Sequence, residues 1–107
     1  MAKQVPFVII FAPEVAPHLE AIDRKYHLLI HKTINDQLEH APLDETRNRK
    51  PLAPPGILGG NWELRLGPQN RFRVIYEVNR KEKIVRIVAI GVKDGNRLNV
   101  AGEEYQP

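Results

Sequence analysis

The stretch at residues 61–78, NWELRLGPQNRFRVIYEV, alternates apolar and polar side chains and predicts a β-hairpin. Its apolar positions are Trp62, Leu64, Leu66, Phe72, Val74, Tyr76 and Val78. Between the two runs, GPQN at 67–70 has the composition of a turn. Arg65 and Arg73 fall on the polar face, where they could be cross-strand neighbours. Two guanidinium groups at such a short distance repel each other, so we expect an anion between them, most naturally a phosphate.

Outward from this hairpin, the pattern predicts one strand and two helices before it and one strand after it. Residues 4–11, QVPFVIIF, predict a strand that is buried on both faces after Pro6. A helical apolar stripe with an expected break at 23–25 comprises Val15, Leu19, Ile22, Tyr26, Ile30, Ile34 and Leu38. Prolines and glycines at 41–60 predict a long loop, 79–82 a second turn, and 83–91, KIVRIVAIG, a third strand.

The expected fold class is therefore α+β, with one amino-terminal strand, two helices and then a three-stranded antiparallel meander. A single core forms most simply if both helices pack on one face of the sheet. The other face then carries Arg65, Arg73 and Arg86.

Length and composition are those of one globular domain, residues 1–107, with a tail from about residue 100. The chain has no cysteine, which excludes disulfides, thiolate nucleophiles and zinc-thiolate sites. We find no signal peptide pattern and no apolar stretch long enough for a membrane span. A cytoplasmic location without a membrane partner is the expectation.

Charge is unevenly distributed along the chain. The net charge is +3, but residues 46–97 hold twelve of the sixteen lysines and arginines and only four of the thirteen acidic residues. This segment carries +8 and the remainder −5, which predicts a surface that faces a polyanion such as nucleic acid. Charge alone fits equally well a set of solvated strand edges that lysine and arginine protect from aggregation.

Motifs for metal or phosphate-loop chemistry are incomplete. His27 and His31 have the i, i+4 spacing of a metal pair, but without HEXXH a solvated helix flank is the better interpretation. GILGG at 56–60 lacks the Lys-Ser/Thr of a phosphate loop. There is no serine, and Thr33 and Thr46 have no recognisable base partner. We therefore expect neither a metal nor a cofactor.

The basic face suits cleavage of RNA by its own 2′-hydroxyl. That reaction needs a base, a proton donor for the leaving oxygen and fixed positive charge on the phosphorane, and arginine supplies only the last. Candidates for proton transfer are Glu63, Lys50, Lys93 and Tyr105. Trp62 and Tyr76 follow the apolar alternation and are interpreted as core residues.

Several segments together resemble the RelE/ParE superfamily of type II toxins, over about residues 3–100. They are WELRLG at 62–67, FRVIYEV at 72–78, AIG at 89–91 with a basic residue after it, FAPEVAPHLEAI at 11–22, and a helix that ends at Ala41-Pro42. The resemblance implies a twisted antiparallel sheet with two amino-terminal helices, and a cognate antitoxin that wraps around the toxin. In the RelE branch the target is messenger RNA in the ribosomal A site, cut without metal or cofactor. In the ParE branch it is DNA gyrase.

The resemblance also implies roles for individual residues. Arg73 matches the arginine placed against the scissile phosphate, while Arg65 and Lys93 match basic positions that orient the RNA. Two positions depart from the RelE pattern: Glu63 stands where a lysine is common, and Asn99 stands about where a catalytic tyrosine is expected. Tyr105 could replace that tyrosine only if the tail folds back over the sheet.

The function expected from the sequence is a ribosome-dependent, metal-independent mRNA endoribonuclease that inhibits translation. The expected catalytic residues are Arg73, Arg65, Lys93 and, as general base, Glu63. The expected RNA-binding residues are Arg47, Arg49, Lys50, Arg71 and Arg97. The alternatives are a non-enzymatic gyrase poison of the ParE type and a nucleic-acid-binding module without toxic activity.

Overall fold

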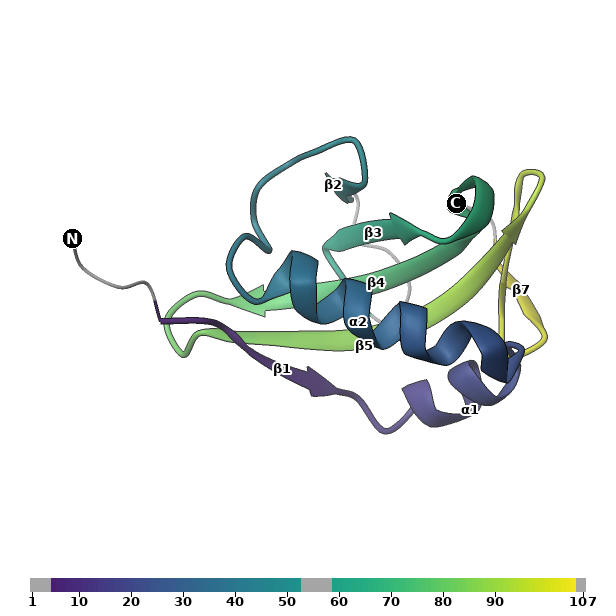
Figure 1. The fold of residues 1–107 in the computed structure, drawn as a ribbon, viewed down its shortest axis with the longest axis horizontal. Helices are drawn as coiled ribbons and strands as arrows, with labels where there is room; N and C mark the ends of the chain where they lie inside the picture. The colour runs from purple at the N-terminus through teal and green to yellow at the C-terminus, as the bar shows by residue number, and fades with distance from the viewer. Residues whose placement is uncertain (1–4, 53–58, 106–107) are drawn as a thin grey trace.

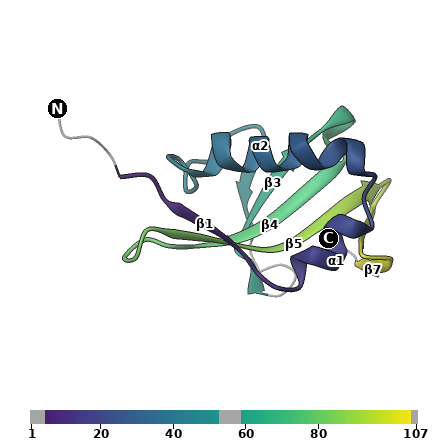
Figure 2. The same ribbon diagram turned by 60° about the horizontal axis from the view of Figure 1, so that its bottom comes forward.

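The computed structural model describes residues 5–52 and 59–105, which form a twisted sheet with helices on one face (Figures 1 and 2). The elements before the hairpin are β1 (Val8–Phe11), α1 (Val15–Glu20), the 3-10 turn η1 (Arg24–Tyr26), α2 (His27–Leu38) and β2 (Arg49–Pro51). The elements from the hairpin onward are β3 (Trp62–Leu66), the 3-10 turn η3 (Pro68–Asn70), β4 (Phe72–Asn79), β5 (Ile84–Asp94), β6 (Arg97–Val100) and β7 (Glu103–Tyr105). None of the helices in these described ranges is long and apolar enough to cross a membrane.

The sheet runs in the order β2-β3-β4-β5-β6-β7 with antiparallel neighbours, and β1 joins it by pairing in parallel with β5. We call the sheet face covered by α1 and α2 the helix face, and the opposite side the outer face. Figure 2 shows α2 above the sheet and α1 beside the end of β5, and side chains of both helices belong to one core. The α+β class and the predicted helix-on-sheet arrangement are confirmed.

The predicted hairpin is β3 and β4, with Trp62 opposite Tyr76, Leu64 opposite Val74 and Leu66 opposite Phe72. All six side chains belong to the core beneath the helices, as their alternation predicts. The hairpin turns at Gly67, whose φ of +83° favours glycine. A Cβ atom there would also overlap the ring of Phe72.

The predicted helical stripe is confirmed, including its interruption. Ile30, Ile34 and Leu38 of α2 are completely buried against the sheet. After α1 ends, the side chain of Asp23 accepts a hydrogen bond from the Lys25 backbone N–H and begins η1.

The prediction that this first strand is buried on both faces after Pro6 is wrong. In β1, Val8 is 59% exposed and Ile10 is 44% exposed, while Ile9 and Phe11 pack against the core. The cause is position: β1 lies outside the main strand order and pairs with β5, and the helices cover only one face. An apolar run does not reveal whether a second layer covers the strand.

The sheet also extends beyond the predicted meander. The 41–60 segment contributes β2, and the predicted tail continues the sheet as β7, which pairs with β6. The outer face is not wholly polar, because a second apolar cluster forms there from Ile75, Val88, Ala89, Leu98 and Val100. Part of the predicted loop, residues 53–58, lies outside the described residues.

Candidate functional site

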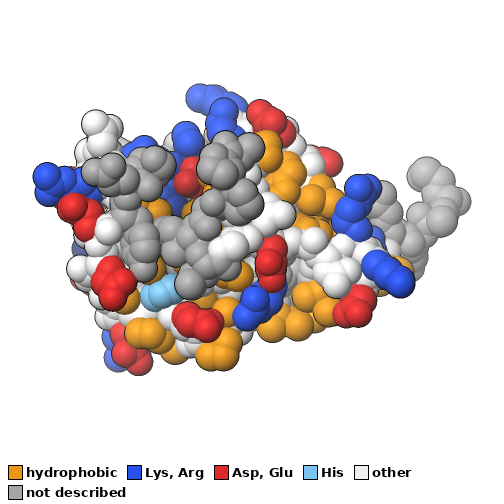
Figure 3. Space-filling view, turned by 180° about the vertical axis from the view of Figure 1, so that it is seen from behind, with side chains coloured by type: hydrophobic (Ala, Val, Ile, Leu, Met, Phe, Trp, Pro, Cys, Tyr) orange, Lys and Arg blue, Asp and Glu red, His pale blue; other side chains and the backbone are white. Residues whose placement is uncertain are grey.

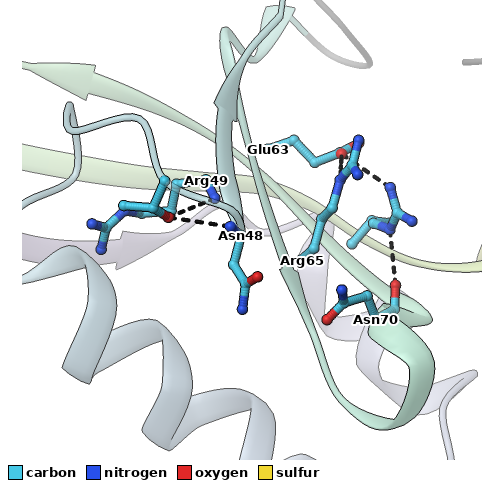
Figure 4. A network of polar contacts seen from close by, with 7 residues as sticks. Asn48, Arg49, Glu63, Arg65 and Asn70 are labelled. Carbon is cyan, nitrogen blue, oxygen red and sulfur yellow. Dashed lines mark hydrogen bonds and ion pairs between the residues drawn. The ribbon is translucent and has the colours of Figure 1, made fainter.

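Arg65 and Arg73 lie directly opposite each other in β3 and β4, as the alternation predicts. A carboxylate offsets part of their positive charge, however. One carboxylate oxygen of Glu63, Oε1, lies 2.8 Å from Nε of Arg65 and 3.1 Å from Nη1 of Arg73 (Figure 4). An anion does lie between the two guanidinium groups, as expected, but the suggestion of a phosphate is corrected: a carboxylate of the protein itself accepts from both.

Arg73 is held at two points and is only 8% exposed. Besides its ion pair with Glu63, its Nε donates to the backbone oxygen of Asn70, 3.0 Å away in the η3 turn. Burial lowers the pKa of Arg73, the charge of Glu63 and its hydrogen bond raise that pKa, and the charge of Arg65 lowers it. Because an arginine stays protonated in proteins, the result is a fixed cation with a defined orientation.

Arg73 lines a polar groove of about 430 Å³ together with Arg71 and Lys93. The other lining residues are Gln69, Asn70, Asp94 and Gly95, and we call this site the arginine groove. The backbone N–H of Lys93 donates to the carbonyl oxygen of Arg71 at 2.7 Å, which joins the end of β5 to the start of β4. Three of the basic residues predicted from the sequence thus meet in one place. In Figure 3, the view onto the outer face, several Lys and Arg side chains gather along the upper edge.

A second cavity, of about 530 Å³, adjoins the arginine groove at Asn70, which lines both. Its other lining residues are Gln37 of α2 and Thr46, Arg47 and Asn48 of the loop before β2, and we call it the amide cavity. Of these, only Arg47 was predicted as a site residue. The basic residues at 46–50 point to this segment and could have led to Asn48. No local sequence pattern predicts that Gln37 lies beside residues 46–48.

Arg49 lies outside this surface, and the expectation that it binds RNA is corrected. It is 8% exposed and stands opposite Leu64, on the side of β2 that faces the core. Its Nη1 donates to Gln37 O at 2.8 Å and Gln37 Oε1 at 2.7 Å, and its Nε donates to Asp44 O at 3.1 Å. These bonds tie the loop before β2 to α2, so the guanidinium group has a structural role.

The other predicted RNA contacts fall in different places. Lys50 stands opposite Glu63 and so shares the outer face with the arginine pair. Arg97 forms an ion pair of 3.3 Å with Glu104 and does not line the arginine groove. Its cross-strand neighbour Asp94 does line that groove, so Arg97 lies beside the groove and not in it.

The candidates for proton transfer are also separated by the fold. Oε1 of Glu63 is already engaged by two guanidinium groups, and Glu63 does not line the arginine groove, so it is poorly placed to take a proton from a substrate there. Asn99 lines a different cavity, on the helix face near His18. As far as Tyr105, the last described residue, the tail forms β7 at the edge of the sheet, with Tyr105 opposite Leu98, and does not fold back over the sheet.

Comparison with known proteins finds a matching family and similar solved structures. Residues 9–94 match the family described as the ParE toxin of the type II toxin-antitoxin system parDE. The fold is similar to a chain in the crystal structure of the toxin-antitoxin complex RelBE2 from Mycobacterium tuberculosis, with a TM-score of 0.67 and 22% sequence identity. That match covers 87% of this chain and 98% of the other. No protein with curated annotation matches.

Proposed function

Because the chain belongs to the ParE toxin family of type II toxin-antitoxin systems, we propose that it is a toxin that inhibits translation by cutting messenger RNA on the ribosome. The observation that carries the proposal is the arginine groove, in which Arg71, Arg73 and Lys93 line one open polar site. A cognate antitoxin is the proposed protein partner.

In this proposal, Arg73 neutralises the scissile phosphate. Its guanidinium group is held by Glu63 and by the Asn70 carbonyl, so its remaining N–H groups are oriented before the substrate arrives. Such preorganised donors stabilise the charge that develops on the phosphorane more than mobile donors do. The cations are supplied by side chains, so the proposed cleavage is metal-independent.

Arg71 and Lys93 hold the neighbouring backbone of the RNA, and Arg65 contributes charge from the outer face. Lys93 and Asp94 line the same groove as Arg73, which makes them better placed for proton transfer than Glu63. Lys93 would donate to the leaving oxygen, and Asp94 would accept the proton of the 2′-hydroxyl.

The test is primer extension on messenger RNA from cells in which the chain is induced without an antitoxin. The proposal expects new 5′ ends within translated regions and an early fall in protein synthesis. Untranslated control transcripts should stay intact, because cleavage depends on the ribosome. Intact messenger RNA at the time of growth arrest would refute the proposal.

Poisoning of DNA gyrase is the second candidate, and two observations favour it. The matching family is the ParE toxin family, and Glu63 already offsets part of the positive charge of the arginine pair that a nuclease would direct at a phosphate. A gyrase poison would leave messenger RNA intact and accumulate cleaved DNA bound to gyrase. Incubating the purified chain with gyrase and supercoiled DNA measures this directly.

A further inference from the structure

The amide cavity is unusual in its chemistry. Its lining comprises three carboxamides, one hydroxyl and one guanidinium, with no carboxylate: Gln37, Asn48, Asn70, Thr46 and Arg47. In Figure 4 the labelled side chains of Asn48 and Asn70 extend from opposite sides toward the space beside α2. Carboxamides and guanidinium groups are the side chains that read the edges of nucleic acid bases.

Gln37 has a defined amide orientation. Arg49 has only donors, and its Nη1 lies 2.7 Å from Oε1 of Gln37, so the amide oxygen must face Arg49. The amide nitrogen, with its two hydrogens, is then the group that Gln37 can present to the cavity. The buried Arg49 thus orients the Gln37 side chain so that its amide nitrogen can donate to a ligand in the cavity.

Two further residues of the cavity also act as donors. Oγ1 of Thr46 accepts from the backbone N–H groups of Asn48 at 3.2 Å and of Arg49 at 3.1 Å, which leaves its hydroxyl hydrogen to donate. Arg47 is exposed and has no acceptor capacity. Gln37, Thr46 and Arg47 therefore favour a ligand with adjacent acceptors.

We propose that the amide cavity binds a guanine base of an RNA strand whose phosphate lies in the arginine groove. Guanine presents two adjacent acceptors, N7 and O6, whereas adenine and cytosine present an amino donor on the corresponding edge. Asn70 lines both sites, so base and phosphate would be neighbours along one strand. This inference deepens the proposed function and rests on RNA being the ligand.

The binding test uses the full-length, nitrogen-15-labelled chain and observes the side-chain amide signals of Gln37, Asn48 and Asn70 by NMR. Each of GMP, AMP, CMP and UMP is added in turn, and inorganic phosphate serves as a separate probe. GMP is expected to shift these signals and to bind about tenfold more tightly than AMP or CMP. Equal affinity for all four nucleotides, or the same shifts with phosphate alone, would overturn the inference.

Gln37→Glu is the informative variant, because it keeps an oxygen for Arg49 while it removes the amide donor. It should lose the preference for GMP. Asn79→Asp is the matched control: it makes the same charge change at the end of β4 and keeps Oδ1 as acceptor for the Glu82 N–H, 3.0 Å away. An equal loss in both variants would show that only net charge matters and would overturn the guanine assignment.

RNA cleavage distinguishes this inference from the proposed function. Cleavage sites of the parent chain should be enriched in guanine at one fixed position, and Gln37→Glu should remove that enrichment. Cleavage without any base preference would overturn the guanine inference alone. Selective GMP binding by a chain that cuts no RNA would refute the nuclease and still support the base site.

Discussion

At the scale of single residues, the Glu63 carboxylate decides how the basic face behaves. Without it, Arg65 and Arg73 would stand opposite each other with like charges. With it, Arg73 is a positioned cation with further N–H groups available to a ligand. An incoming phosphate therefore meets a site whose net charge is lower than the count of arginines indicates, and Arg71 and Lys93 must supply the difference.

The first prediction concerns Arg73→Ala. Glu63 keeps Arg65 as its partner, so the fold should persist, while the loss of one preorganised donor should lower the cleavage rate about a hundredfold or more. Growth arrest after induction and circular dichroism of the purified variant measure the two effects. Arg86→Ala is the control, because Arg86 pairs with Glu77 and does not line the arginine groove. A folded Arg73→Ala variant as toxic as the parent would exclude Arg73 as the phosphate ligand.

A second prediction concerns Glu63→Ala. Removing a mostly buried carboxylate leaves two facing guanidinium groups and should lower the free energy of unfolding by about 3 kcal/mol. Phosphate should restore more stability to this variant than it adds to the parent, because it can replace the missing charge. Thermal unfolding with and without phosphate tests this. Glu77→Ala, at an exposed ion pair, should show neither effect, and an equal phosphate response in both variants would contradict the prediction.

At the scale of elements, buried polar side chains hold the loop before β2 in place. Arg49 bonds to Gln37 and Asp44, and the hydroxyl group of Tyr76 donates to the carbonyl of Pro42 at 2.7 Å. Burial raises the pKa of Tyr76, so its hydroxyl remains a donor. These contacts fix the loop that carries Arg47 and Asn48, and so position one wall of the amide cavity.

The third prediction compares Arg49→Ala with Arg47→Ala, which remove the same charge two residues apart. Arg49→Ala should lower the free energy of unfolding by about 3 kcal/mol, because hydrogen bonds from a buried guanidinium group are lost. Arg47→Ala should change stability by no more than about 0.5 kcal/mol. Urea unfolding of both variants gives these values. Equal destabilisation would mean that Arg49 has no special structural role.

His18 connects α1 to the sheet, and its protonation makes the free energy of unfolding depend on pH. Its Nδ1 accepts a hydrogen bond from the Ile90 backbone N–H at 3.3 Å, which requires the neutral ring. Burial lowers the pKa of His18 below its ordinary value, although Glu14 and Glu103 partly oppose this. The unfolded chain therefore binds the proton more tightly, and the stability present above about pH 6.5 is lost as the pH falls.

The fourth prediction follows from this loss of stability at lower pH. The free energy of unfolding should decrease between pH 7.5 and pH 5.5, and His18→Gln should show a shallower decrease, because glutamine can accept from Ile90 without titrating. Urea unfolding at both pH values makes the comparison. A variant with the parent's full pH dependence would assign the effect to other groups.

At the scale of the whole molecule, the two faces of the sheet have different roles. The helix face is filled by the main core, whereas the outer face combines the arginine pair, Lys50 and a small apolar cluster. A neutralising antitoxin segment is expected to cover the arginine groove and bring acidic residues to it, because complementary charge favours that contact.

The fifth prediction tests this placement by hydrogen exchange of the chain with and without its antitoxin. Backbone amides of residues 69–71 and 93–95, which line the arginine groove, should become protected in the complex. The solvent-facing side of α2 should keep the exchange of the free chain. Protection confined to that side of α2 would contradict the prediction.

Local patterns were sufficient for much of the fold. The β3–β4 hairpin, the interrupted helical stripe and the opposition of Arg65 and Arg73 could be predicted, because strand alternation, helical period and turn composition depend on neighbouring residues. The sequence likewise indicated that Arg71, Arg73 and Lys93 belong to a basic surface, although it did not reveal that they line one groove.

The sequence by itself therefore determined which side chains share a face, and the tertiary structure decided which of them meet. Alternation places Glu63 on the polar side with Arg65 but does not show that its carboxylate also reaches Arg73 across the hairpin. The exposure of β1, the burial of Arg49 and the meeting of Gln37 with residues 46–48 depend on how distant segments pack. The physical reason is that the periodicity of a strand or helix fixes the direction in which each side chain leaves the backbone. The residues that this side chain contacts are fixed only when the sheet, the helices and the loop pack together.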